Sequence, residues 1–380
     1  MSTVRIPFNR ATLLGQELPY IAQAVENGHL AGDGEFTRRS SKILEDEVGV
    51  SKVFLTTSCT HALEMSGLLL GLEPGDEFIV PSFAFVTTAN AFVLRGAKPV
   101  FIDVRPDTLN MDETQLEGLI TERTKAIIPL HYAGVACEMD PIMEIAQRHG
   151  IGVIEDNAHG LFGSYKGRKL GTFGALATQS FHETKNLTCG EGGALLINDE
   201  DLIERAEVLR EKGTDRSRFF RGQVDKYSWV DVGSSYLPSE ILAAFLTAQL
   251  EGRVEIQAAR GAIWNRYNEE LAQWAGEHGV GLPAVPEHCE QPFHMFYLML
   301  PSLAVRGRMI KFLRARGILA VFHYLPLHIS DMGMRFGGKP GDCPVTEDIS
   351  DRLLRLPLFY GLSAEHQQEV IEAVQAFDEF

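Results

Sequence analysis

The chain has 380 residues, of which 45% are hydrophobic and 23% charged, a composition typical of soluble globular proteins that excludes disordered and fibrous classes. Its 35 Lys and Arg residues against 51 Asp and Glu residues leave a formal net charge of −16, which disfavours nucleic acid and anionic membrane surfaces as partners. The first ten residues contain no apolar signal core, and no apolar run reaches the ~18 residues of a membrane span. We therefore expect a cytoplasmic protein of about two domains.

Seven short runs rich in β-branched residues alternate with helical patterns in the first half of the chain. The runs span residues 52–56, 76–81, 97–104, 124–132, 151–156, 176–181 and 193–199. They are continuously apolar, which is typical of strands with both faces covered by helices. The pattern predicts a mostly parallel α/β sheet.

The second half of the chain has a different pattern. A long helical pattern runs from about Pro238 to Tyr267, and from His294 onward a strand, a helix and a strand are followed by a C-terminal helix over 363–377. We place a domain boundary near residue 250. The predicted domains are 1–250, a large cofactor-binding α/β domain with an N-terminal arm, and 251–380, a small α+β domain.

Ligands of open parallel sheets bind at the carboxyl ends of the strands, so the residues that follow each run are the candidates. After the first run, Ser58, Cys59 and Thr60 stand where a helix begins, and the free amides of a helix start bind anions. A plain helix cap is the alternative. After the fifth run, Asp156 and His159 could hold a positive ring nitrogen, bind a metal or cap a helix.

The sixth run leads into "SFHETKN", which contains Ser180 and Lys185. A lysine with an ordinary pKa near 10.4 is a poor nucleophile at neutral pH, but a desolvated one suits carbonyl chemistry. An anion site, an acidic strand end and a lysine on one edge of the sheet are the three groups that pyridoxal 5'-phosphate (PLP) needs, for its phosphate, its pyridine nitrogen and its aldehyde.

Other cofactors lack support in the sequence. "GEGG" does not match the dinucleotide-binding pattern and does not lead from a strand into a helix. In "HYLPLH", Pro326 between His323 and His328 excludes the helical zinc motif. The five cysteines are dispersed and never spaced C-x-x-C, so we expect reduced thiols and no metal.

These residues resemble the nucleotide-sugar aminotransferases of the DegT/StrS family. The resemblance implies the PLP-dependent type I aminotransferase fold, with a large domain built on a mostly parallel seven-stranded sheet and a smaller C-terminal α+β domain. It also implies a homodimer with shared active sites. Within the family, the chain is similar from end to end to the enzymes that form dTDP-4-amino-4,6-dideoxygalactose. The strings that carry this similarity include "GDGEFTRR", "ANAFVLRGAKPVFIDVRPDTLNMDET", "HYAGVACEMD", "RGQVDKYSWVDVGSSYL", "AVFHYLPLH" and "LLRLPLFY".

The resemblance assigns roles to the strand-end residues. Lys185 would form the covalent link to the cofactor and later move protons, and Asp156 would pair with the pyridine nitrogen. Phe85 would stack on the ring. His159, where the family often has Gln, would contact the ring or its phenolic oxygen. The phosphate would be held by Ser180 together with Ser58, Cys59 and Thr60.

Further roles concern the neighbouring subunit and the substrate. "GSSYL" departs from the family's G-x-N-x-R pattern and places Ser235 where an Asn reaches the partner's phosphate. Arg221 and Lys226 belong to a basic run that would meet the diphosphate or the donor carboxylates, with a solvated loop as the alternative. His323 and Tyr324 would contact the sugar, with core packing as the alternative for Tyr324.

The activity that the resemblance implies is transfer of an amino group from L-glutamate to the C4 ketone of a dTDP-4-keto-6-deoxyhexose, with the galacto product favoured. Four different activities remain open, which are gluco stereochemistry, a 4-ketopentose substrate, a C3 aminotransferase and a non-catalytic sugar-responsive regulator. Some relatives are 3-dehydratases with His in place of the lysine. Because Lys185 is present, this last activity is disfavoured.

Overall fold

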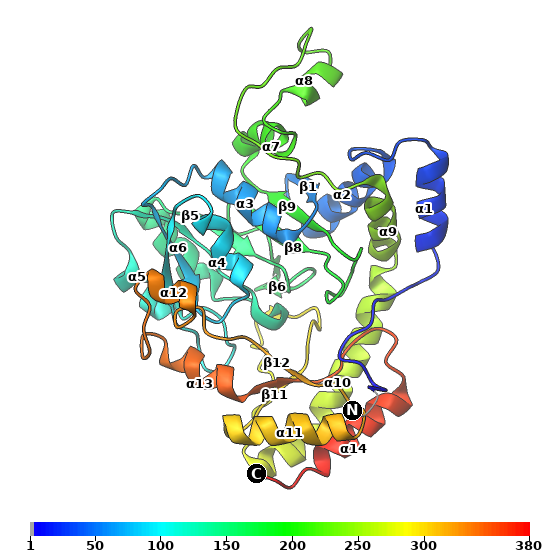
Figure 1. Cartoon of the computed structure of the whole chain (residues 1–380), viewed down its shortest axis with the longest axis vertical. Coiled ribbons are helices and arrows are strands. Elements are labelled where there is room, and N and C mark those ends of the chain that lie inside the picture. The colour runs from blue at the N-terminus through cyan, green and yellow to red at the C-terminus, as the bar shows by residue number, and fades with distance from the viewer. Residues whose placement is uncertain (1–3) are drawn as a thin grey trace.

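The computed structural model describes residues 4–380, and its centre is a seven-stranded sheet in the order β1-β9-β8-β5-β4-β2-β3 (Figure 1). The strands are β1 (Lys52–Thr56), β2 (Glu77–Pro81), β3 (Lys98–Ile102), β4 (Thr124–Ile127), β5 (Gly152–Asp156), β8 (Leu176–Ser180) and β9 (Gly193–Ile197). Every pairing is parallel except those of β9, which runs antiparallel to β1 and β8. The predicted sheet, with a strand in each of the seven runs, is confirmed.

Helices cover both faces of this sheet, as the apolar strands require. Successive residues of a strand point to opposite faces, and in β1 Phe54 packs into one core while Val53 and Leu55 pack into another. The first face carries α3 (Cys59–Leu69), α4 (Val86–Val93) and α7 (Ile203–Arg210). The other carries α5 (Leu116–Leu119), α6 (Met139–His149), α2 (Glu35–Val48) and α9 (Glu240–Glu251), with α1 (Glu17–Glu26) outside them.

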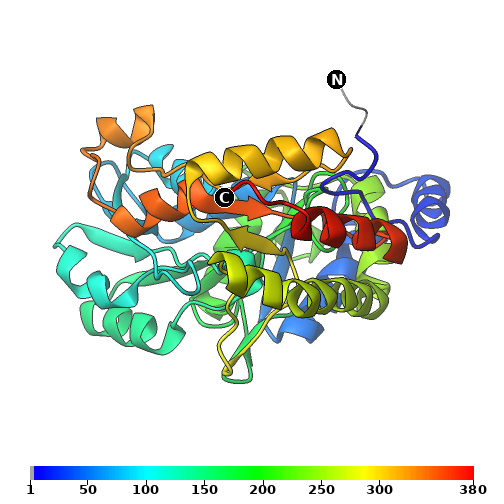
Figure 2. The ribbon, with the colours of Figure 1, turned by 90° about the horizontal axis from the view of Figure 1, so that it is seen from below.

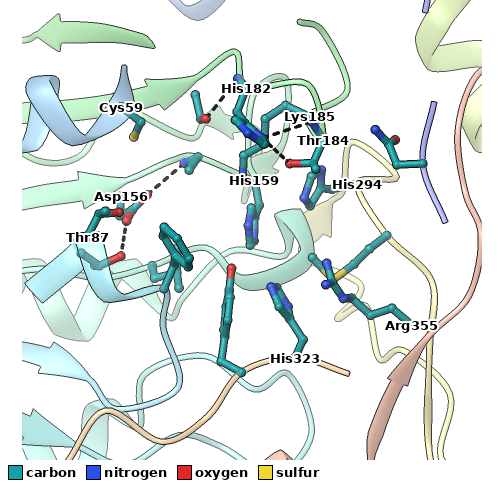
Figure 3. A pocket seen from close by; sticks show the side chains of 18 of the residues that line it. Cys59, Thr87, Asp156, His159, His182, Thr184, Lys185, His294, His323 and Arg355 are labelled. Atoms are coloured by element: carbon teal, nitrogen blue, oxygen red, sulfur yellow. Dashed lines mark hydrogen bonds between the residues drawn. The ribbon is translucent and has the colours of Figure 1, made fainter. Parts of the chain in front are cut away.

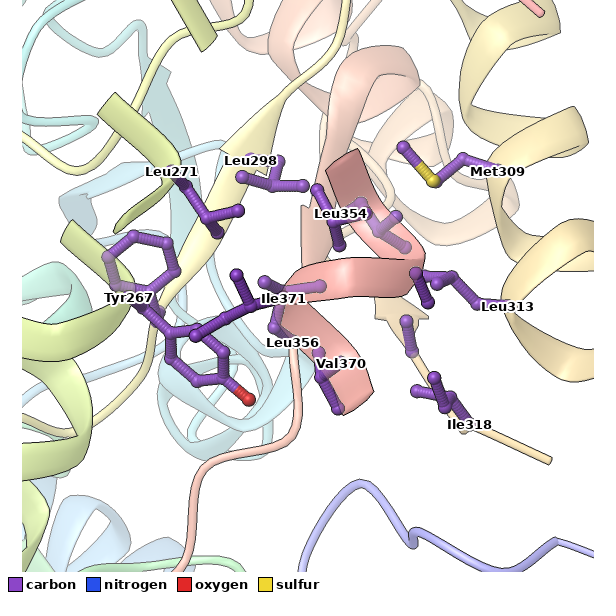
Figure 4. Packing of buried hydrophobic residues seen from close by; sticks show 14 of the residues in the cluster. Tyr267, Leu271, Leu298, Met309, Leu313, Ile318, Leu354, Leu356, Val370 and Ile371 are labelled. Atoms are coloured by element: carbon purple, nitrogen blue, oxygen red, sulfur yellow. The ribbon is translucent and has the colours of Figure 1, made fainter. Parts of the chain in front are cut away.

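A smaller antiparallel sheet lies in the C-terminal part, in the order β11-β13-β12. Its strands are β11 (Tyr297–Met299), β12 (Val321–Phe322) and β13 (Leu353–Arg355). Figure 2 shows α10 (Arg253–His278), α11 (Leu303–Ala315) and α14 (Ala364–Gln375) beside this sheet. Figure 4 shows part of the shared core, where Leu298, Leu354 and Ile371 meet. Here β11, α11, β12 and α14 match the expected order, and β13 was not predicted.

The helical pattern from Pro238 to Tyr267 does not form one continuous helix. Two helices replace it, α9 and α10, and Gly252 lies between them, where the chain leaves the helical path. The second helix, α10, extends to His278. Its C-cap is Gly279, whose φ of 62° lies in the left-handed region, which glycine adopts without the strain that a Cβ would cause. The expected domain boundary near residue 250 falls at this junction and stays a prediction.

The remaining elements connect the two sheets or lie at the surface. They are β6 (Ser164–Tyr165), β7 (Arg168–Lys169) and β10 (Cys289–Glu290), which form a third sheet; α8 (Arg216–Phe220), α12 (Asp331–Arg335) and α13 (Pro344–Arg352); and the 3-10 turns η1 (Glu113–Gln115), η2 (Tyr132–Gly134) and η3 (Glu200–Leu202). Within residues 4–380, no helix is long and apolar enough to cross a bilayer. All five cysteines are free thiols, as expected.

Candidate active site

A cavity of about 590 Å³ lies at the carboxyl ends of β5 and β8, and residues of the C-terminal part of the chain, among them His323 and Arg355, also line it (Figure 3). Open parallel sheets bind ligands at this edge. Its lining includes ten of the residues singled out from the sequence, which are Ser58, Cys59, Thr60, Phe85, Asp156, His159, Ser180, Lys185, His323 and Tyr324. The fold therefore brings together residues that lie up to 266 positions apart in the chain.

The N-terminus of α3 forms one wall of the cavity. Ser58 is the N-cap, and its Oγ accepts a hydrogen bond from the amide of His61 at 3.1 Å. The expected cap is therefore present, and it leaves the first-turn amides of Cys59 and Thr60, which have no intrahelical acceptor, for an anion. Ser180, at the end of β8, adds a hydroxyl to the same cavity.

Asp156 is the last residue of β5, and its carboxylate is buried and held in place. Thr88 Oγ1 donates to Oδ2 at 2.7 Å, and the amide of Ala158 donates to Oδ1 at 3.1 Å. Burial raises the pKa of Asp156, and the two hydrogen bonds and the charge of Lys185 oppose that rise. A carboxylate desolvated in this way gains from a cation that enters the cavity, such as a protonated pyridine nitrogen.

Lys185 lies in the loop after β8, on the same edge as Asp156. Burial lowers the pKa of Lys185 to about 8, the negative charge of Asp156 opposes the shift, and the positive charge of Arg355 adds to it. Among residues 4–380, no hydrogen bond or ion pair engages its Nζ. The amine is therefore both unpartnered and closer to neutral than an ordinary lysine, which suits attack on an aldehyde.

Three imidazoles, those of His159, His294 and His323, also line the cavity. The ring of His159 stacks on that of His294, with centroids 4.3 Å apart, and lies 6.2 Å from that of His323. Burial lowers the pKa of all three well below the usual range, so the rings are neutral at pH 7. The buried Nδ1 of His159 has no hydrogen-bond partner in the chain, which leaves a polar atom ready for a ligand.

Aromatic rings form the mouth of the cavity. Phe85 is the N-cap of α4 and is 53% exposed, which is unusual for so large an apolar side chain. Its centroid lies 6.2 Å from that of Tyr324, which in turn packs against Phe83. Tyr132 is buried beneath them, and a hydrogen bond of 2.9 Å joins its hydroxyl to Nδ1 of His323.

Three of the residues singled out from the sequence lie outside this cavity. Arg221, Lys226 and Ser235 belong to an excursion that carries α8 and projects from the large domain (Figure 1). Arg221 forms an ion pair with Glu207 at 2.8 Å, and Ser235 is exposed and bridges to the backbone of Glu211. Within one chain these three residues do not meet the others, and their roles stay predictions.

Several lining residues were missed from the sequence. They include Phe8, Asn9, Thr88, His294 and Arg355. For Arg355 a signal was present, because a single arginine stands in the apolar run "LLRLPLF". The others carried no signal, since a Thr inside a helix and two residues of an N-terminal arm are ordinary in sequence.

The cavity residues fit PLP in its three parts. Helix-start amides and hydroxyls match the phosphate, the desolvated carboxylate of Asp156 matches the ring nitrogen, and the free amine of Lys185 matches the aldehyde. The unpartnered Nδ1 of His159 and the exposed ring of Phe85 face the same space. The donor set therefore suits this cofactor.

Comparisons with known proteins agree with this geometry. The model of the DegT/DnrJ/EryC1/StrS aminotransferase family matches residues 13–375. The chain is 36% identical to GDP-perosamine synthase from Caulobacter vibrioides, with 97% of each chain covered. It superposes on DesV from S. venezuelae with a TM-score of 0.91 at 30% identity, covering 100% of both chains.

The structure of Spr1654 from Streptococcus pneumoniae in its PMP form superposes with a TM-score of 0.91 at 26% identity, covering 98% of each chain. The structural neighbours share the type I aminotransferase fold, and enzymes of this family are PLP-dependent transferases. The chain, a sugar aminotransferase with the type I fold, therefore belongs to the DegT/DnrJ/EryC1/StrS aminotransferase family.

Proposed function

We propose that this enzyme transfers an amino group from L-glutamate to the C4 ketone of a dTDP-4-keto-6-deoxyhexose and forms the galacto amino sugar. The observation that carries the proposal is that one cavity beside a helix start contains both a free amine, that of Lys185, and a buried carboxylate, that of Asp156. The dTDP sugar, the C4 position and the configuration rest on the sequence resemblance.

PLP supplies an aldehyde that takes up nitrogen and a ring that spreads the negative charge formed when a C–H bond ionises. The chain supplies the rest. Asp156 keeps a proton on the ring nitrogen, because its own desolvated charge is stabilised by that cation. Lys185 moves the proton at the reacting carbon, and with a pKa of about 8 roughly a tenth of it is neutral at pH 7.

The sugar would enter through the aromatic mouth. Phe85 and Tyr324 offer apolar rings to a hexose, and His323, held by Tyr132, is a neutral ring with a hydrogen-bonding edge. Arg221 and Lys226, which lie outside this cavity, would meet the diphosphate in the active site of a partner subunit. This division of labour requires a homodimer, which we propose as the working form.

The comparison with relatives does not decide which nucleotide the sugar substrate carries. The name of the 36% identical synthase refers to a GDP sugar, whereas the strings in this chain resemble enzymes of dTDP sugars. A C3 aminotransferase and a non-catalytic regulator are competing functions. The free amine at Lys185 and the held carboxylate at Asp156 favour catalysis over regulation.

A single set of incubations tests the proposal. The purified protein, loaded with PLP, is given L-glutamate and in turn dTDP-4-keto-6-deoxyglucose, its GDP counterpart and a 3-keto isomer, and the products are assigned by NMR. We expect an axial amine at C4, the galacto configuration, from the dTDP substrate. An equatorial amine or a preference for another ketosugar would replace this substrate assignment by the one that the product identifies.

The Lys185→Ala variant tests the chemistry itself. We expect kcat to fall by at least roughly 10²–10⁴, because the base that moves the proton is lost. The Lys42→Ala variant, which removes a surface lysine paired with Asp46, is the matched control and should keep the wild-type rate. Equal rates in all three proteins would contradict the central role of Lys185.

A further inference from the structure

Side chains of α10 hold four consecutive backbone carbonyls, those of the 292–295 segment, which leads into β11. The donors are three and four positions apart in the helix, so they lie on one face of it. The bonds run from Gln257 Nε2 to Pro292 at 3.1 Å, from Arg260 Nε to Phe293 at 3.1 Å, from Arg260 Nη2 to His294 at 2.6 Å and from Trp264 Nε1 to Met295 at 3.1 Å. One helix face therefore fixes this segment residue by residue.

The conformation of the 292–295 segment has a cost in stability. Phe293 has a φ of 54°, in the left-handed region that residues other than glycine rarely adopt. Arg260 is 2% exposed, no ion pair within residues 4–380 includes it, and burial lowers its pKa to about 9. Strained backbone and a buried charge both destabilise a fold, and they persist where the surroundings determine them. Together they position His294, which lines the active-site cavity.

The side chain of His294 is held by Asn186, the residue that follows Lys185. Nδ1 of the ring lies 2.8 Å from Oδ1 of Asn186. The other end of that amide fixes its orientation, because Nδ2 donates at 2.6 Å to the carbonyl of Pro292, which can only accept. An amide oxygen cannot donate, so Nδ1 of His294 carries the proton, and Nε2 of the neutral ring does not. A residue beside Lys185 thereby determines the tautomer of His294.

The ring of His294 in turn supports that of His159. Their centroids lie 4.3 Å apart with 21° between the planes, and Figure 3 shows both rings in the cavity that Lys185 lines. Within residues 4–380, the side chain of His159 forms no hydrogen bond, although it is only 4% exposed. Contacts between rings therefore orient it, and His294 is the nearest of these rings. The free Nδ1 of His159 keeps its direction in the cavity because of this stack.

We infer that His294 is a positioning residue of the reaction. Its ring holds that of His159 against the cavity, and its bond to Asn186 joins this support to the loop of Lys185. The inference rests on the roles proposed for His159 and Lys185. A displacement of about 1 Å at a reacting group can lower the rate by about 10². The contacts of α10 thus set, through one histidine, how Lys185 and the ring of His159 lie relative to each other.

Two variants separate the ring of His294 from its hydrogen bond. His294→Phe keeps a flat ring for the stack and loses the bond to Asn186, whereas His294→Ala loses both. In the PLP-loaded enzyme we expect kcat to fall about fivefold in His294→Phe, since one neutral hydrogen bond is lost, and roughly 10² in His294→Ala. The KM values for L-glutamate and the ketosugar should stay within about twofold, because the change acts on the reacting groups and not on substrate binding.

Two spectroscopic signals test the positioning without turnover. In protein labelled with ¹⁵N at histidine, NMR should show the proton of His294 on Nδ1, and Asn186→Ala should remove that preference. The signal is assigned to His294 by its absence in His294→Phe. The second signal is the absorbance of bound PLP as a function of pH. Its midpoint should shift by at least about half a unit in His294→Ala, since the groups around the cofactor move, and a residue that only adds stability would not shift it.

His278→Ala is the matched control. Nδ1 of His278 lies 2.8 Å from the carbonyl of Trp274, and its ring stacks on that of Phe380 with centroids 4.4 Å apart, but His278 lies outside the cavity. The variant removes an equivalent stack and hydrogen bond, so kcat and the PLP midpoint should equal those of the wild type. The melting temperature reports how far each variant is destabilised.

A folded His294→Ala with the wild-type kcat and an unchanged absorbance midpoint would overturn the inference. A proton on Nε2 of His294 in the wild type would contradict the link to Asn186. If His294→Ala does not fold, His294→Phe decides, because wild-type kcat in that variant means that the bond to the lysine loop does not matter. If the wild type aminates no ketosugar, the proposed function fails instead, and the NMR and PLP signals still test the position of His294.

Discussion

The environment of Lys185 sets it apart from the surface lysines of the chain. Burial and the nearby Arg355 lower its pKa to about 8, whereas Lys42, on an exposed turn of α2, has its pKa raised by a hydrogen bond to Asp46. The protonated form of a desolvated amine loses hydration, so its proton leaves more readily. Two lysines of one chain therefore differ in reactivity at the same pH.

A labelling experiment on the cofactor-free protein measures this difference. Only neutral amines react with an acylating reagent, so labelling of Lys185 should rise as pH increases to about 8 and level off above about 9. Labelling of Lys42 should keep rising beyond pH 10 in the same samples. Mass spectrometry of the digested protein quantifies both. A parallel rise of the two lysines through pH 10 would show that burial does not lower the pKa of Lys185.

At the scale of elements, the close approach of β9 to α3 shapes the anion site. A Cβ at Gly193, the first residue of β9, would lie 2.3 Å from the amide nitrogen of Cys59 and 2.3 Å from the carbonyl carbon of Ser58. Only glycine allows this approach, because the obstructing atoms are backbone. The start of α3 is thereby held against the sheet, where its amides face the cavity.

Gly193→Ala should therefore weaken cofactor binding. We expect PLP affinity, measured by absorbance titration, to fall at least tenfold, and stability to fall by about 1–3 kcal/mol from overpacking. Gly276→Ala is the control, because an added Cβ in that exposed turn of α10 meets nothing within 4 Å and favours the helix. Wild-type PLP affinity in Gly193→Ala would show that the helix start does not position the phosphate.

At the scale of the whole molecule, the excursion over residues 211–235 leaves large apolar side chains uncovered. Trp229 is 79% exposed and Phe220 69% exposed, on the same segment as the predicted partner-facing residues Arg221, Lys226 and Ser235. Exposed apolar groups of this size mark interaction sites. A second copy of the chain is the occupant that the proposed homodimer requires, since it would also bring the basic residues to an active site.

Sedimentation velocity tests that arrangement. The wild type should sediment as a dimer, and Trp229→Arg should shift the equilibrium toward monomer and reduce activity. Leu303→Arg, at a 50% exposed apolar position on α11, should leave the dimer unchanged. If Trp229→Arg remains a fully active dimer, the excursion does not form the subunit contact.

Much of the large domain could be predicted, because its strands are determined by short, continuous segments of the sequence. Continuous apolar runs identify buried parallel strands; Asp156 ends one of those runs, and Lys185 lies in the loop that follows another. The break at Gly252 was missed, because the helical pattern continues on both sides of it. Strand β13, which follows α13 directly, was also missed.

The sequence by itself determined the sheet, the strand ends and the residues that suit PLP, because strand periodicity and residue chemistry are properties of short segments. Tertiary structure decided which distant segments complete the cavity. Arg355 and His294 come from the small domain and Phe8 from the N-terminal arm, and only their packing against the large domain places them near Lys185. The lowered pKa of Lys185 is likewise determined by the tertiary structure, since desolvation depends on all the groups that surround the amine.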